Sequence, residues 1–350
     1  MGTKTMKFKT QEFNKMLDAV KPVAEIANAS VRCNLMYFNS DDVVVSSGQV
    51  TVVYPFPIEC DPFMLRFSDL NSVVKSIRQP EFPFEMTKQT VKIKTPEIKA
   101  DLTMCDDNPS RFNDIINKMA EITKDRWQKL PDSFKEALKA AYFSVAKNDR
   151  LGVLTGIHIN HYCTVGSDNH RVTCYNMNER TRINRVVLAK NIECIWHLPL
   201  ISYSILDNLL VFSTKDNIWA AVATLEDIEF PDYSEVLDVE RANLSFNIEF
   251  SKEVINEIDL VKMFASGGTA PIEVSVSKDG LTCSYDSDFG RILKYIKVDL
   301  KARKETQFKV NPLYFLQAVN VFNKAKVHLF ENKIVFTTDN ASHAIALFSE

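Results

Sequence analysis

The strongest constraint on the fold is a repeat, because the same helical pattern returns about every 120 residues. Each copy places apolar residues at positions i, i+3, i+4 and i+7, which form one face of an α-helix that packs against other structure. The three copies are Phe13, Met16, Leu17 and Val20; Phe134, Ala137, Leu138 and Ala141; and Val254, Ile258 and Val261, with polar Glu257 at the remaining position. A chain of 350 residues has room for two or three domains, and this period selects three.

A second set of apolar stripes lies between the copies of the first. Its members are Leu70, Val73, Val74 and Ile77; Ile192, Ile195 and Trp196; and Phe315, Ala318, Val319 and Phe322. Segments rich in β-branched and aromatic residues fill the rest, and they predict strands at 43–45, 51–54, 91–94, 157–159, 209–212, 272–276, 295–298 and 333–336. Each repeat is therefore predicted to be an α+β domain with two helices on an antiparallel sheet, and we place the domains at 1–123, 124–238 and 239–350.

The composition argues against several classes of protein. Only 9 of the 350 residues are glycine, and they form neither G-x-G-x-x-G nor G-x-x-x-x-G-K-[ST], so no dinucleotide fold, P-loop or cofactor is expected. The 7 cysteines include no C-x-x-C, and the first residues lack an apolar stretch, so we expect no signal peptide and a reduced, cytoplasmic location. No apolar run approaches the roughly 18 residues of a membrane helix.

The formal net charge of −3 argues against nucleic-acid binding through a simple basic tail, but the cations recur in each repeat. The first predicted helices and their ends carry Lys15 and Lys21, then Lys135, Lys139 and Lys147, then Lys252 and Lys262; the second carry Lys75 and Arg78, then Lys190, then Lys324. These residues are either ordinary solvated helix faces or one concave basic surface. The second interpretation predicts binding to the phosphate backbone of DNA without readout of sequence.

The sequence offers only weak candidates for a catalytic or metal-binding site. His158, His161 and Cys163 are close in sequence, but residues 158 and 161 of a strand point to opposite faces, so strand residues around a turn are favoured over a metal site. Asp168 with His170, or Asp286 with Asp288, would be an acid–base or metal pair in an enzyme. Neither pair comes with a nucleophile motif or a cofactor loop, and Asp168 and His170 also fit a turn whose side chains bond the backbone. We therefore predict no enzymatic activity and no metal.

Several short motifs in order resemble the bacterial-type β sliding clamp, the processivity subunit of DNA polymerase III. Met6-Lys7-Phe8 is similar to the family's opening strand, and Ser167-Asp168-Asn169-His170-Arg171-Val172 to its T-D-G-H-R-L segment. Phe230-Pro231-Asp232-Tyr233 resembles its F-P-D-Y segment, and Phe308-Lys309-Val310-Asn311 and the strand at 343–348 also fit. The resemblance covers the whole chain. The chain is slightly shorter than typical members and diverged, which is compatible with a phage-encoded version.

The resemblance implies a ring. Two chains of three similar domains close head to tail into a homodimer, with helices lining the hole and sheets forming the outer wall. Strands pair across each domain boundary, so that no sheet edge is left free. Such a ring would encircle duplex DNA and hold the polymerase, the clamp loader and other proteins through short linear peptides, with no membrane partner. The recurring cations listed above would then face the DNA, in the bacterial nucleoid or the cytoplasm of a phage-infected host.

The resemblance also implies a partner-peptide groove between the second and third domains. The positions carried over to this sequence are Leu154, Ser167, His170, Arg171, Val172, Pro231, Val236, Ala344, Ala346, Leu347 and Phe348. Isolated apolar positions such as Leu154 are also typical of an ordinary core. A Q-x-x-L-F-like peptide is the expected ligand.

The chain departs from the family pattern at three places in this groove. Asn169 replaces the motif glycine, Glu235 stands where arginine is common, and Ala346-Leu347-Phe348 replaces a Met-Pro-Met pattern. The peptide preference is therefore expected to be shifted. A diverged clamp of this kind would alternatively act as a transcription co-activator, or as a decoy that sequesters clamp-binding proteins. The recurring lysines favour encirclement of DNA, because a decoy does not need them.

Overall fold

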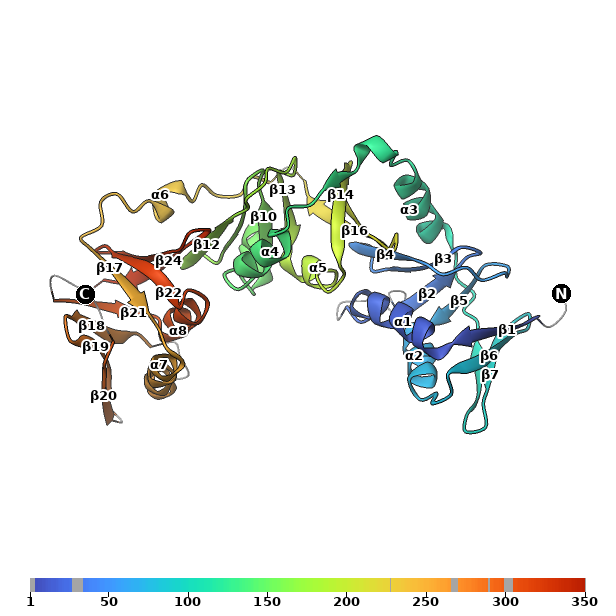
Figure 1. The fold of residues 1–350 in the computed structure, drawn as a ribbon, viewed down its shortest axis with the longest axis horizontal. Coiled ribbons are helices and arrows are strands. Elements are labelled where there is room, and N and C mark those ends of the chain that lie inside the picture. The colour runs from blue at the N-terminus through green and yellow to red at the C-terminus, as the bar shows by residue number, and fades with distance from the viewer. Residues whose placement is uncertain are drawn as a thin grey trace. The chain divides into compact units, whose positions relative to one another are not determined.

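The structure is a computed structural model that describes residues 4–26, 34–226, 228–265, 270–288, 290–298 and 305–349 (Figure 1). Cys33 and the two ends of the chain lie outside the described residues. The chain divides into two compact units, one formed by Met1–Leu130 with Lys190–Glu226 and the other by Pro131–Ala189 with Asp227–Glu350. Each unit is described below by itself.

The first unit is built from two antiparallel sheets. Its elements are β1 (Lys4–Lys9), α1 (Thr10–Ala24), β2 (Leu35–Phe38), β3 (Asp42–Ser46), β4 (Val50–Pro55), β5 (Phe63–Arg66), α2 (Phe67–Lys75), β6 (Glu81–Met86), β7 (Thr90–Lys94), β8 (Lys99–Thr103), α3 (Ser110–Ala120), the 3₁₀ turn η2 (Lys124–Arg126), β9 (Gln128–Lys129), β14 (Leu200–Leu206), β15 (Leu209–Thr214) and β16 (Trp219–Leu225). One sheet has the order β1-β6-β7-β8. The other has the order β5-β2-β3-β4-β16-β15-β14-β9.

The second unit has the same kind of architecture. Its elements are α4 (Phe134–Tyr142), the 3₁₀ segment η3 (Asp149–Thr155), β10 (Gly156–Ile159), β11 (Cys163–Ser167), β12 (Arg171–Asn176), β13 (Arg185–Leu188), α6 (Ser234–Leu237), β17 (Leu244–Glu249), α7 (Lys252–Phe264), β18 (Ile272–Ser277), β19 (Gly280–Ser287), β20 (Gly290–Ile296), β21 (Thr306–Val310), α8 (Pro312–Val321), β22 (Lys324–Leu329), β23 (Lys333–Thr337) and β24 (Ala341–Phe348). Strands pair in the order β13-β10-β11-β12-β24-β23-β22-β17. A second series, β20-β19-β18-β21, joins the other end of β24. The short helix α5 (Ala189–Glu193) spans the division between the units.

The order of elements repeats three times along the chain. Each repeat runs strand, helix, four strands, helix and three strands: β1 to β8, then β9 to β16, then β17 to β24. Helix α3 lies between the first two repeats, and α6 between the last two. The pairings of β4 with β16 and of β12 with β24 each join strands from successive repeats. The α+β organisation that the two helical stripes predict is therefore confirmed.

The predicted helical stripes are the buried faces of the helices. On α1 the side chains of Phe13, Met16, Leu17 and Val20 are completely buried, and the equivalent residues of α4 and α7 are buried too. Pairs of helices lie side by side within each unit, α1 with α2 and α7 with α8 (Figure 1). Helix α8 begins where the sequence favours it, since Asn311 caps the backbone N–H groups of Leu313 and Tyr314 and Pro312 occupies the first turn.

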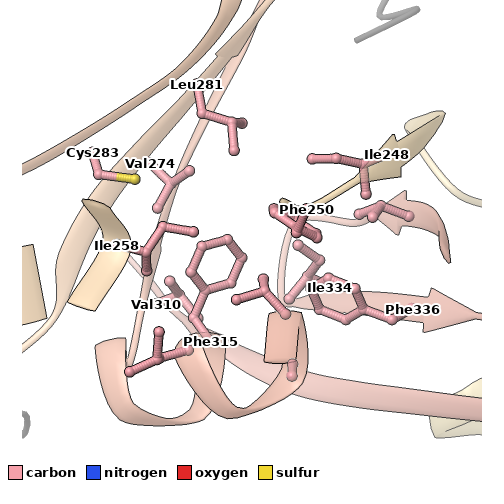
Figure 2. Close-up of a cluster of buried hydrophobic side chains, with 14 of the residues drawn as sticks. Ile248, Phe250, Ile258, Val274, Leu281, Cys283, Val310, Phe315, Ile334 and Phe336 are labelled. Atoms are coloured by element: carbon pink, nitrogen blue, oxygen red, sulfur yellow. The ribbon is translucent and has the colours of Figure 1, made fainter. Parts of the chain in front are cut away.

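The side chains of the third repeat meet in one core (Figure 2). Ile258 of α7, Phe315 of α8, Val274 of β18 and Phe336 of β23 point toward one another there. The Phe315 ring centroid lies 6.3 Å from that of Phe336, and each buried side chain of this size contributes roughly 1.5–3 kcal/mol. Burial of the helix stripes against the sheets therefore supplies much of the stability of this part.

Two local predictions differ from the structure. The stripe at 192–196 predicts a longer helix than α5, which ends at Glu193; Ile192 and Ile195 are nevertheless fully buried. The predicted strand at 295–298 is only partly correct, because β20 ends at Ile296. Within the described residues, no helix is long and apolar enough to cross a membrane.

Candidate functional site

A groove with a volume of about 650 Å³ opens on the second unit. Its lining residues come from three separate segments: 167–172, 230–241 and 330–346. The lining comprises Ser167, Asn169, His170, Arg171, Val172, Phe230, Pro231, Asp232, Tyr233, Glu235, Val236, Asp238, Arg241, Phe330, Asn332, Lys333, Ala344, Ile345 and Ala346. A concave surface of this size accommodates a few side chains of a bound ligand.

The floor of the groove is the place where β12, β24 and β23 lie side by side. Val172 pairs with Ala344, and Ala344 pairs in turn with Val335 of β23. These three residues belong to a buried apolar cluster, against which Phe230 and Tyr233 pack from the wall. The floor is therefore a paired, apolar sheet surface rather than a mobile loop.

The turn between β11 and β12 forms one end of the groove. Asn169 has a φ of 74°, a left-handed conformation that asparagine tolerates better than most residues. Glycine also adopts this conformation readily, so Asn169 is compatible with the backbone of this turn. The Asp168 carboxylate accepts hydrogen bonds from the backbone N–H groups of His170 and Arg171, each at 3.1 Å. Asp168 thus acts as a turn-forming residue, as one interpretation of the sequence predicts.

The Arg171 side chain is the most constrained charged group of the site. Its Nε donates to Asp168 at 2.9 Å, and the side chains of the two residues are only 5% and 10% exposed. Its guanidinium also donates to Gln317 of α8 and stacks over the Tyr314 ring, 4.3 Å from the centroid. A buried ion pair with these additional partners fixes the turn to α8.

The wall of the groove, residues 230–238, is bound to the floor by Lys333. Its Nζ donates to the backbone carbonyl oxygens of Glu235, Val236 and Asp238 at 2.8, 2.9 and 3.0 Å. The ammonium also lies 4.4 Å from the centroid of the Phe330 ring. Lys333 therefore links short helix α6 to β23, in addition to the packing of Leu237 on the apolar cluster.

A buried histidine lies behind the floor. His343 of β24 is completely buried, bonds the Thr173 hydroxyl through Nδ1 at 2.8 Å and lies among the rings of Phe143, Phe322 and Phe336. Burial and, second, the positive charge of Arg171 lower the pKa of His343 to about 3. The histidine is therefore neutral in the folded protein at neutral pH.

This low pKa predicts acid sensitivity of the second unit. The unfolded chain binds a proton at His343 below about pH 6.5, whereas the folded protein does so only near pH 3, so stability is lost as the pH falls through this window. By pH 5 the loss from this residue is expected to be about 2 kcal/mol. Urea unfolding followed by circular dichroism at pH 7 and pH 5 measures it. His343→Gln should reduce the difference between the two pH values, and an unchanged difference would contradict the assignment.

The predicted groove residues divide into two sets. Ser167, His170, Arg171, Val172, Pro231, Val236, Ala344 and Ala346 line the groove together. Leu154 is instead buried in η3, while Leu347 and Phe348 lie on the part of β24 that pairs with β21. The sequence predictions did not include Phe230, Tyr233, Phe330 and Lys333; for the first two, the F-P-D-Y motif was the available signal.

The predicted DNA-facing cations are all at least partly exposed, but they differ in their partners. Six have a carboxylate within 4.0 Å: Lys15 (Asp216), Lys21 (Glu25), Lys75 (Asp18), Arg78 (Glu97), Lys262 (Asp259) and Lys324 (Glu249). Within the described ranges, Lys135, Lys139, Lys147, Lys190 and Lys252 make no ion pair, and all five are exposed. Lys324, which the sequence predictions place at the end of a helix, is the first residue of β22.

The residues considered for a metal site have separate partners. His158 bonds Asn184 at 2.9 Å, His161 bonds the Thr181 carbonyl at 3.2 Å, and the Cys163 thiol lies 3.4 Å from the Tyr233 hydroxyl. In the part of the chain that the structure describes, no three His, Cys, Asp or Glu side chains are grouped to hold a metal ion.

Solved structures with the same fold cover the entire chain. The beta subunit of a DNA polymerase of Streptococcus pyogenes has a TM-score of 0.83 and 13% identity over 99% of this chain and 100% of its own. The DNA polymerase III beta subunit of Thermotoga maritima has a TM-score of 0.82 and 13% identity, with complete coverage of both chains. The DNA polymerase sliding clamp of Bacillus subtilis has a TM-score of 0.81 and 14% identity, with 99% of each chain covered.

No protein-family model and no curated protein sequence matches the chain. The fold is therefore detected by structure where sequence similarity is very low. The resemblance predicted from the short motifs is confirmed at this level: the chain has the α+β fold of DNA polymerase III beta subunits over its whole length.

Proposed function

We propose that the protein is a DNA sliding clamp, which encircles duplex DNA and tethers a polymerase and other clamp-binding proteins to it. The observation that carries the proposal is the full-length match to beta subunits and sliding clamps, with nearly all of both chains covered. Domain-sized similarity would be compatible with many functions. A match through three successive repeats instead preserves the whole architecture on which encirclement depends.

The proposed assembly is a head-to-tail homodimer with three domains per chain, at 1–123, 124–238 and 239–350. The threefold order of elements supports three equivalent domains. The pairing of β4 with β16 and of β12 with β24 adds that, within each unit, a sheet continues from one repeat into the next. Two such chains would supply six domains to a closed ring.

We assign contacts with DNA to the recurring cations of the helices. Contacts with partner proteins are assigned to the groove. Lysines that have no neighbouring carboxylate are free to approach phosphates, and such contacts do not depend on base sequence. The apolar floor and the aromatic wall of the groove suit one or two apolar side chains of a short linear peptide. Polymerase and clamp loader are the proposed sources of such peptides.

The ring is tested by mass and by topology, without a clamp loader. Light scattering should give twice the chain mass of 39.9 kDa. The protein is then allowed to thread onto a linear duplex with biotin at both ends, and streptavidin is added to block them. Retention after a high-salt wash is expected only when the ends are blocked. A monomer that is retained equally on free and blocked DNA would refute the proposal.

A further inference from the structure

The charged side chains that line the groove differ in whether they already have partners within the protein. Three carboxylates belong to the wall, on Asp232, Glu235 and Asp238, and all three residues are exposed. The lining also contains three cations, Arg171, Arg241 and Lys333. The charge offered to a ligand depends on which of these groups already have partners.

Two of the three cations are engaged inside the protein. Arg171 is buried and paired with Asp168 at 2.9 Å, so that its charge is compensated before any ligand arrives. The three N–H groups of the Lys333 ammonium are matched by the three carbonyl oxygens of the wall. Burial lowers the pKa of Lys333, while the negative charges of Asp238 and Glu235 act in the opposite direction.

The carboxylates of the wall remain available. Asp232 accepts a hydrogen bond from the Ser234 N–H at 2.9 Å, which lowers its pKa and keeps it ionised. Asp238 accepts one from the Glu240 N–H at 2.9 Å. Among the described lining residues, exposed Arg241 has no ion pair, and the Lys333 ammonium keeps its positive charge near Asp238 and Glu235. Three carboxylates beside an apolar floor therefore outnumber the two cations, Arg241 and Lys333, that are not paired with a buried carboxylate.

We propose that the groove selects linear peptides in which a lysine or arginine stands beside the apolar anchor, with Glu235 as a specificity-determining residue. This inference rests on the proposed function, since it names the kind of peptide that the groove takes. The apolar anchor lies on the floor near Val172 and Ala344, and the cation faces the wall. Exposed pairs are individually weak, so three carboxylates together are expected to give about a tenfold preference at low salt. The preference should shrink at higher salt, since screening acts over about 10 Å at 0.1 M.

Three fluorescent peptides test the inference by anisotropy at low salt. All contain the same Q-x-x-L-F anchor, and their remaining positions carry lysine, serine or glutamate. The lysine peptide should bind about tenfold more tightly than the serine peptide, and the glutamate peptide more weakly than both. Equal binding of all three would overturn the inference and leave peptide binding intact. If none binds, the proposed groove function fails together with the inference.

Matched variants assign the effect to the wall. Glu235→Lys, at an exposed position, should remove or reverse the preference for the lysine peptide. Asp279→Lys makes the same charge change at an exposed turn between β18 and β19, outside the groove lining, and should leave the preference unchanged. An unchanged preference in Glu235→Lys would overturn the role of this residue, and equal effects of both variants would show that only net charge matters.

Discussion

Replacement of Lys135, Lys139 and Lys252 by glutamate is expected to weaken binding to duplex DNA by at least about 100-fold near 0.1 M salt. All three side chains are exposed on α4 or α7 and have no ion pair within the described ranges. Each lost phosphate contact reduces the slope of log affinity against log salt by about 0.9, so the slope should fall by about 2 to 3. Fluorescence anisotropy with a labelled duplex, repeated over a salt series, measures both quantities.

The control for this variant changes the net charge equally at other places. Lys88, Lys215 and Lys278 are exposed in strand-connecting turns, and their replacement by glutamate should weaken DNA binding only slightly. If both triple variants lose the same amount of DNA affinity, the DNA-binding surface is not formed by the helices. Unchanged DNA binding of the first variant would contradict the assignment of these three lysines to the DNA surface, whereas a native protein that does not bind DNA would favour a decoy.

The ion pairs refine which of the predicted cations matter. The sequence places Lys15 and Lys75 in the same pattern as Lys135, yet they lie 3.1 and 2.8 Å from carboxylates of Asp216 and Asp18. Asp216 is about 200 positions from Lys15 in the chain, so no local pattern predicts this contact. A phosphate would have to compete with these carboxylates, and neutralisation of Lys15 or Lys75 should therefore affect DNA binding less than neutralisation of Lys135.

The fold was predictable because the repeat is visible in the sequence. Helix periodicity and strand composition recur within each third of the chain. Helix α3 was not predicted, although Phe112, Ile115, Ile116 and Met119 follow the same i, i+3, i+4, i+7 spacing as the other stripes. It interrupts the repeat, so a search for recurring segments passes over it. Helix α5 was predicted too long, since burial of Ile192 and Ile195 requires only a helical turn followed by irregular backbone.

The groove was only half predictable from sequence. Residues 167–172 and 230–233 each form a contiguous sequence motif. Recognition of such a motif identifies all of its residues at once. Lys333 reaches the wall across nearly 100 positions of sequence, and its role appears only when β23 lies beside the floor strands. The resemblance places Leu347 in the groove as part of the C-terminal strand, but this strand continues past the groove lining, and Leu347 pairs with Val310 of β21. Local motifs therefore identify the segments 167–172 and 230–233, whereas tertiary contacts determine how these segments and β23 combine into one groove.

Removal of the Asp168 carboxylate is expected to cause the largest loss of stability in the second unit. Asp168→Ala leaves the Arg171 guanidinium buried without its anion, and loss of one partner of a buried pair costs about 3–5 kcal/mol. The variant also removes the acceptor for two backbone N–H groups of the turn. Amide hydrogen exchange of β12 and β24 is the suitable measurement, since Trp127, Trp196 and Trp219 all belong to the first unit and their fluorescence would not report on this site.

A second aspartate–arginine pair of the same unit supplies the control. Asp286 and Arg291 lie 3.8 Å apart with side chains 72% and 65% exposed, so Asp286→Ala should cost less than about 1 kcal/mol. Asp168→Asn separates the two contributions at the turn, because an amide oxygen can still accept from the backbone while the charge is lost. If Asp168→Asn is as stable as the native protein, the ion pair contributes little and the turn hydrogen bonds account for the effect. Equal, small changes in Asp168→Ala and Asp286→Ala would contradict a stabilising role for burial of this pair, and the groove would then keep its shape without it.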